Sequence, residues 1–186
     1  MKHRLLWFVQ VSILSLTGFA ADSKTDLSQL KAAAVKGDAI AQFKLGAAYS
    51  KGDGVPRSDM EAVNWFLKSA KQGYPQAQHN VAVAHDNGYG VVRNTAKAAL
   101  WYRKAANQGF AESQFSLGVM YYDGEGVGKD MVEAHKWMNL AASQDHKQAR
   151  AALEKAEETM TPEQIVEARK RAAAFKPKKE VAAKKK

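Results

Sequence analysis

The residue types that most often carry out chemistry are sparse in this sequence and show no catalytic spacing. The chain has no cysteine, which excludes disulfides, thiolate metal ligands and a thiol nucleophile. Four histidines follow the N-terminal segment, without an H-E-x-x-H motif or a carboxylate cluster beside them: His79, His85, His135 and His146. A metal site assembled from distant parts of the chain is the alternative left open. The sequence predicts no catalytic residue, no metal site and no cofactor.

A glycine-rich segment from Gly124 to Gly128 has the composition of a phosphate-binding loop. A nucleotide-binding loop follows a β-strand and continues into Lys-Ser/Thr or a βαβ unit. This segment follows a predicted helix, and its leading glycines recur elsewhere at a fixed interval. No serine lies in a G-x-S-x-G motif. The glycines therefore indicate turns, and the chain is predicted not to be an enzyme.

The strongest pattern in the chain is an interval of 36 residues, which separates Trp65, Trp101 and Trp137. The same interval relates five further sets of identical residues: Gln42, Gln78 and Gln114; Gly52, Gly88 and Gly124; Gly54, Gly90 and Gly126; Val55, Val91 and Val127; Ala62, Ala98 and Ala134. A period of this length is typical of proteins built from stacked helical or mixed repeats.

Each unit has the pattern of two helices joined by a Gly-x-Gly-Val loop. Apolar residues recur at helical spacing from Ala39, and Gly52 ends this first helix because glycine tolerates φ > 0. The second helix begins at an N-capping side chain in all three units: Ser58, Asn94 and Asp130. It ends at Gly73 and Gly109, but the third unit has Asp145 there, which predicts a strained or differently turned corner.

The repeated small and large residues indicate close packing within each unit. Gly46 and Gly118 remove side-chain volume from the first helix, and the ring of Trp65, Trp101 or Trp137 is expected to fill the space beside it. One pair of helices cannot bury both of its faces, so the units must stack. The predicted fold is all-α, a right-handed α-solenoid over residues 21–175. Its repeats cover about 38–73, 74–109 and 110–145, with a helix over 26–36 before them and capping helices over 147–175 after them.

The two ends of the chain differ from the repeats. Residues 1–20 have a basic start, a short apolar run and small residues before the predicted cleavage after Ala20, so a signal peptide and a periplasmic or secreted protein are predicted. An uncleaved membrane anchor is the alternative. Residues 176–186 hold six lysines and one glutamate, which predicts a disordered tail. The tail either only aids solubility or makes a weak contact with anionic polymer or lipid.

The charge of the chain does not point to a specific nucleic-acid site. The net charge is +9, but residues 21–175 contribute only +2 of it. The basic residues are thus concentrated at the ends rather than along a groove.

The segments AQFKLGAAYSKGDGV and AVNWFLKSAKQG, with their counterparts in the next two units, resemble the Sel1-like repeat family, which is related to tetratricopeptide repeats. The resemblance covers residues 37–145 and, with the caps, most of 26–175. It implies a protein-binding or scaffolding role in a family whose bacterial members are often exported. Some cysteine-rich exported relatives are β-lactamase-like, and this chain lacks their cysteines.

By the same analogy, the first helices of the units line a concave groove. The positions expected to face it vary between units, and the predicted partner-binding residues are Phe43, His79, Asp86, Asn87, Phe115, Val119, Tyr122 and Asp123. Packing between neighbouring repeats is the alternative for Phe43 and Phe115. The predicted function is a non-catalytic interaction or scaffold module of the cell envelope that binds a peptide or protein segment. The alternative is an envelope hydrolase or a polymer-binding protein.

Overall fold

The computed structural model describes residues 27–178, which form nine helices and no strand. The helices are α1 Leu27–Val35, α2 Ala39–Lys51, α3 Asp59–Ala70, α4 Pro75–Asn87, α5 Thr95–Asn107, α6 Ala111–Asp123, α7 Met131–Ala142, α8 Lys147–Glu157 and α9 Pro162–Ala173. The prediction of an all-α repeat fold is confirmed. The predicted signal peptide and residues 179–186 lie outside the described part of the chain. Within residues 27–178, no helix has the length and apolar character needed to cross a membrane.

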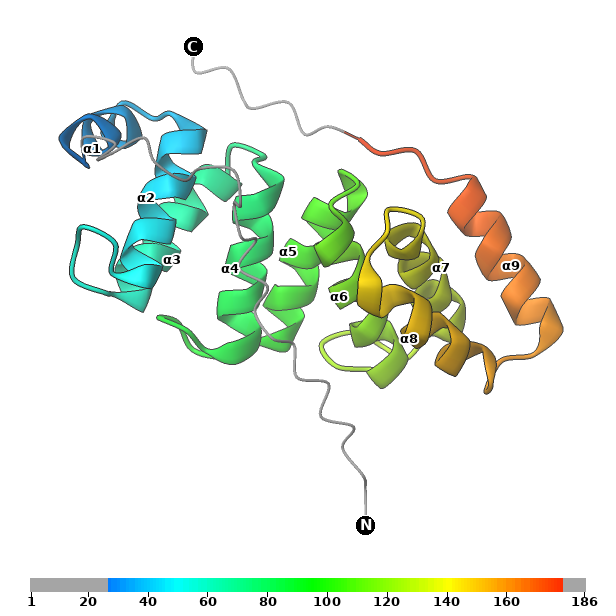
Figure 1. The fold of residues 1–186 in the computed structure, drawn as a ribbon. Helices are drawn as coiled ribbons and strands as arrows, with labels where there is room; N and C mark the ends of the chain where they lie inside the picture. The colour runs from blue at the N-terminus through cyan, green and yellow to red at the C-terminus, as the bar shows by residue number, and fades with distance from the viewer. Residues whose placement is uncertain (1–26, 179–186) are drawn as a thin grey trace.

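The helices follow one another along a row, with α1 at one end and α8 and α9 at the other (Figure 1). Three pairs pack most closely, α2 with α3, α4 with α5, and α6 with α7. The second helix of each pair also packs on the first helix of the next pair, and α1 contacts α2 in the same way. The apolar core therefore continues from repeat to repeat, as expected for units that cannot bury both faces alone.

Local side-chain chemistry sets the helix ends. Ser58, Asn94 and Asp130 each accept a hydrogen bond from the backbone N–H three residues later, at 3.2, 2.9 and 3.0 Å, so the predicted N-caps are confirmed. The corner at Asp145 does not turn differently, because its φ of 61° is left-handed like the 86° of Gly73. An aspartate in this region is less favourable than a glycine.

Buried glutamines join each repeat to the one before it. The Nε2 atoms of Gln42, Gln78 and Gln114 donate to the carbonyls of Ala34, Ala70 and Ala106 in the preceding second helix, at 3.0, 3.3 and 3.2 Å. Their Oε1 atoms accept from a second set of glutamines at 2.8, 2.8 and 2.7 Å: Gln72, Gln108 and Gln144. Each amide thus connects three helix ends, which accounts for the spacing of the first set.

The residue after each tryptophan, rather than the tryptophan itself, fills the space beside the small residue of the first helix. A β-carbon on Gly46 would lie 2.7 Å from the Phe66 ring, and one on Gly118 would lie 2.8 Å from Met138 Cγ. The tryptophans face the preceding repeat instead. Trp137, for example, is buried in a cluster with Tyr102 and other residues of the second repeat. The expected position of the tryptophan rings is therefore corrected.

In the second and third repeats, the second glycine of the loop allows the loop to rest on the preceding repeat. Gly90 has a φ of +66°, and a β-carbon on it would lie 2.3 Å from the carbonyl oxygen of Asp59 at the start of α3. Gly126 stands in the same relation to Thr95 at the start of α5, also at 2.3 Å. These two glycines are required both by the backbone angle and by the close approach of another backbone.

The C-terminal end departs from the repeat pattern. Helix α9 packs on α7 rather than forming a close pair with α8, and Arg171 forms an ion pair with Glu133 of α7 at 3.0 Å. After α9 the chain turns back toward the middle of the row (Figure 1), and the N–H of Lys178 donates to the carbonyl of Asn107 at 2.9 Å. The segment predicted as a tail from Lys176 thus begins against the solenoid. We call residues 174–178 the C-terminal strap.

We predict that Gly90→Ala strongly destabilises the protein, because it adds both an unfavourable φ and a clash with Asp59. The free energy of unfolding should fall by about 2–4 kcal/mol in urea unfolding. Gly54→Ala is the matched control, since φ is +69° but the nearest atom to its β-carbon is a Leu27 methyl at 3.6 Å. Gly128→Ala should be nearly neutral, because nothing lies within 4 Å. Equal losses for Gly90→Ala and Gly54→Ala would contradict the close approach to Asp59.

The glutamine network gives a second prediction. Gln78→Leu should lower the free energy of unfolding by about 2–3 kcal/mol, because it removes one of the hydrogen bonds of the Ala70 carbonyl and one of those of the Gln108 amide. Gln108→Leu should cost less when Gln78 is already replaced. A double-mutant cycle measured by thermal and urea unfolding checks this, and strict additivity of the two losses would count against the network.

Candidate functional site

Three of the predicted partner-binding residues are engaged in packing between repeats. Phe43, His79 and Phe115 occupy equivalent positions, and each ring lies against the residue that precedes the next first helix. The ring centroids are 5.2 Å apart for Phe43 and Tyr74, 5.4 Å for His79 and Phe110, and 4.6 Å for Phe115 and His146. These contacts favour the packing alternative for Phe43 and Phe115, and they extend it to His79.

His79 is the polar member of this series, and its surroundings keep it neutral. Burial lowers the pKa of His79 to about 4, with a smaller contribution from the positive charge of His146. Its Nδ1 lies 2.9 Å from the hydroxyl of Ser113 in the next repeat. A neutral imidazole can accept a hydrogen bond from that hydroxyl, so His79 acts as a junction residue rather than as an exposed partner contact.

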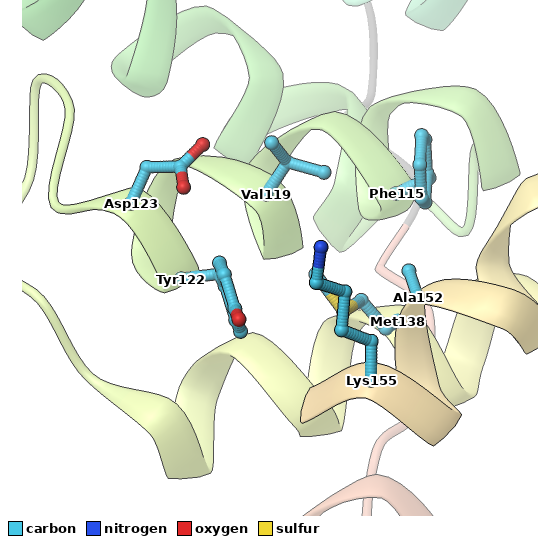
Figure 2. Close-up of a pocket in the computed structure, with 7 residues that line it drawn as sticks. All are labelled: Phe115, Val119, Tyr122, Asp123, Met138, Ala152 and Lys155. Atoms are coloured by element: carbon cyan, nitrogen blue, oxygen red, sulfur yellow. The ribbon is translucent and has the colours of Figure 1, made fainter. Parts of the chain in front are cut away.

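Four predicted residues border one small pocket between α6 and α8. Phe115, Val119, Tyr122 and Asp123 come from α6, and Lys155 extends toward them from α8 (Figure 2). The pocket has a volume of about 20 Å³, which is room for about one water molecule. Met138 of α7 and Ala152 of α8 complete its lining. The pocket is thus a dimple in a surface and is too small for an organic ligand.

Asp123 lines this pocket, and two further acidic side chains, Asp86 of the second repeat and Glu125 of the third, are linked to it by electrostatic interactions. Burial raises the pKa of Asp86, and the nearby Glu125 raises it further while Arg93 lowers it. The pKa of Asp123 is also raised, first by burial and then by Glu125, against the lowering effect of Lys129 and Lys155. Glu125 is therefore within electrostatic reach of both aspartates. We call Asp86, Asn87, Tyr122, Asp123 and Glu125 the acidic strip.

The strip is open to solvent at several points. Asn87, Asp123 and Glu125 are exposed, and Tyr122 is half-buried. The amide of Asn87 donates to the Val83 carbonyl of its own helix at 3.0 Å. Arg93 reaches Glu125 at 3.8 Å, with both side chains 55% exposed, so this ion pair contributes little to stability.

The remaining histidines do not assemble a metal centre in the described part of the chain. His135 is buried and its Nε2 lies 2.7 Å from Glu157 Oε1. That carboxylate also accepts from Arg169 at 2.9 Å, so the pair connects α7 to α8 and α9. Within residues 27–178, no three His, Asp or Glu side chains are grouped to hold a metal ion.

The sequence alone did not reveal two sets of residues, Lys155 at the pocket and the ring partners at the junctions between repeats. Lys155 was not predicted to join the site, because α8 has no counterpart of the loop that follows the other first helices. The partners of the junction rings do carry a signal, because Tyr74, Phe110 and His146 are 36 residues apart and all have rings. Their pairing with Phe43, His79 and Phe115 follows only when the stacking of helices is known.

The fold and its junctions define an α-solenoid of paired helices related to tetratricopeptide repeats. The Sel1 repeat profile matches residues 39–74, 75–110 and 111–146. The chain therefore belongs to the Sel1 repeat family. Proteins of this family are generally protein–protein interaction modules and typically non-catalytic.

Solved structures of related proteins share this fold. The Sel1 repeat protein from Oxalobacter formigenes is 38% identical with a TM-score of 0.66, over 70% of this chain and 98% of that one. The protein c5321, a protective antigen present in uropathogenic Escherichia coli strains and displaying an SLR fold, is 37% identical with a TM-score of 0.71. That match covers 80% of this chain, which spans only 33% of c5321. No curated protein matches the chain significantly.

The lowered pKa of His79 predicts loss of stability in acid. The imidazole has its ordinary pKa of about 6.5 in the unfolded chain, so below that pH the unfolded state binds a proton that the folded state does not. The free energy of unfolding should therefore fall between about pH 6.5 and about pH 4, by on the order of 2 kcal/mol. Urea unfolding across this range measures the effect.

The matched variant for this prediction introduces the residues that the other repeats have at these positions. His79→Phe copies Phe43 and Phe115, and Ser113→Ala copies Ala41 and Ala77, so that no hydroxyl is left unpaired. The double variant should lose most of the acid sensitivity; the part that remains belongs to His85 and His146, whose pKa values burial also lowers. An unchanged pH slope in the double variant would show that His79 is not the responsible group.

Proposed function

We propose that this protein is a non-catalytic interaction module of the cell envelope, exported by its N-terminal signal, that binds a segment of another protein along the acidic strip. The observation that carries the proposal is the strip itself. Glu125 lies within electrostatic reach of both Asp86 and Asp123, and the pKa of each aspartate is raised, first by burial and further by the repulsion of Glu125. An incoming cation would relieve that repulsion.

The chemistry of the strip favours a peptide that carries Lys or Arg beside an apolar side chain. Tyr122 offers a ring and a hydroxyl next to the carboxylates, which suits the mixed contacts of protein interfaces. The exposed amide of Asn87 can hydrogen-bond to a peptide backbone. Four of the five strip residues lie on first helices, and Glu125 lies in the loop after α6. First helices line the concave groove in tetratricopeptide repeats, and Val119 with the dimple at Lys155 forms the apolar side of the strip.

The test is capture from an envelope extract with a photo-reactive residue at Tyr122, followed by identification of the crosslinked segment. The variant Asp86→Lys with Asp123→Lys should reduce capture by about tenfold, because it replaces attraction of a cationic segment by repulsion. Its matched control is Asp53→Lys with Glu163→Lys, which changes the charge equally at exposed positions away from the strip.

The same experiment separates groove binding from attachment through the lysine-rich tail. A chain ending at Lys178 keeps the C-terminal strap but lacks residues 179–186, the last eight residues of the predicted tail, which include four lysines. Capture that survives this truncation and is lost in the strip variant supports the proposal. Capture that survives the strip variant and is lost on truncation assigns binding to the tail instead.

A further inference from the structure

The C-terminal strap shows how this solenoid binds an extended segment. The ring of Phe175 lies edge-on to Trp137, with centroids 5.5 Å apart and planes at 72°. Pro177 covers Gly109, its Cγ 3.4 Å from the position that a β-carbon on the glycine would take. Three residues after Phe175, the N–H of Lys178 donates a hydrogen bond to the Asn107 carbonyl. Tryptophan, glycine and a helix-end carbonyl thus hold a segment of the form Phe-x-Pro-x.

The same three elements recur two repeats earlier. The counterparts of Trp137, Asn107 and Gly109 are Trp65, Val35 and Gly37. These three residues line one pocket between α1, α2 and α3, with a volume of about 380 Å³. A pocket of this size is within the range that holds organic ligands or peptide side chains. The Val35 side chain is 75% exposed, so an occupant would remove an apolar surface from water.

The charge of this pocket differs from that of its C-terminal counterpart. Lys68 and Lys71 line it, and Lys68 Nζ lies 3.6 Å from the centre of the Trp65 ring. The equivalent positions beside the strap are Leu140 and Ser143. An uncharged groove suits the lysines of the strap, whereas Lys68 and Lys71 would repel them. The strap of a second copy is therefore the wrong ligand for this pocket, and an acidic segment is the right one.

We propose that the pocket at Trp65 binds an extended acidic segment of a partner protein in which an aromatic residue is followed two positions later by proline. The aromatic ring packs edge-on against Trp65, the proline covers Gly37, and flanking carboxylates pair with Lys68 and Lys71. This pocket shares no residue with the acidic strip, so it goes beyond the function proposed above and can fail or succeed independently of it.

The test is fluorescence anisotropy with a labelled peptide Asp-Phe-Glu-Pro-Glu and the chain that begins at Ala21. The peptide should bind the wild type and bind Lys68→Glu with Lys71→Glu at least about tenfold more weakly. The matched control, Lys51→Glu with Lys147→Glu, changes the net charge equally at exposed positions and should leave affinity unchanged. The charge-reversed variant should instead gain affinity for Phe-Lys-Pro-Lys. Circular dichroism and thermal unfolding establish that all variants are folded.

Several results would overturn the proposal. Equal binding of peptides in which the Phe or the Pro is replaced by Ala would mean that only charge attracts them. Tighter binding of Phe-Lys-Pro-Lys than of the acidic peptide to the wild type would assign the pocket to the strap of a second copy. Displacement of the probe by a peptide of residues 21–26 would assign it to the chain's own N-terminal segment. Absence of binding by the acidic peptide would also refute it.

Discussion

The structure depends on a buried amide at each junction between repeats. Gln78, for example, donates to the end of the preceding second helix and accepts from the glutamine at the end of its own second helix. Apolar side chains tolerate small shifts of one helix on another, but a buried amide that loses its partner costs about 1–3 kcal/mol. The network therefore fixes both the turn before each first helix and the length of the unit. This constraint explains the constant interval of 36 residues better than the tryptophans do.

Features that depend on local chemistry were predictable from the sequence. The caps at Ser58, Asn94 and Asp130 and the glycine helix ends follow from backbone groups within a few residues. The neighbour that each side chain faces was not predictable in the same way. Large side chains recur at a period of 36 both at the position of Trp65 and at that of Phe66, whose equivalents are Tyr102 and Met138. The period alone therefore cannot tell which position meets Gly46. Neighbouring residues are about 100° apart around a helix. Only the way the two helices pack on each other decides which of the two side chains contacts Gly46.

The same ambiguity limited the prediction of the site. Phe43, His79 and Phe115 differ between repeats, which is compatible with a surface that reads a partner. Their contacts show a different cause, since each ring packs against a ring that precedes the next first helix. One ring can replace another at such a junction without leaving the space between the repeats empty. Two turns further along the same helices, four residues remain accessible in whole or in part: Asp86, Asn87, Tyr122 and Asp123. Variation between repeats thus marks a partner surface only where no neighbouring repeat covers it.

The end of the solenoid also has a physical cause that can be traced to one position. Gly46, Ala82 and Gly118 let a second helix approach the first, and the equivalent residue of α8 is the exposed Glu154. A glutamate there keeps a second helix at a distance, because its carboxylate would have to leave water. Helix α9 therefore packs on α7 instead of α8, and this placement delivers the strap to the groove at Trp137. The array of repeats therefore ends at the helix that lacks this small residue. The C-terminal strap covers the groove at Trp137, whereas the equivalent groove at Trp65 contains an open pocket.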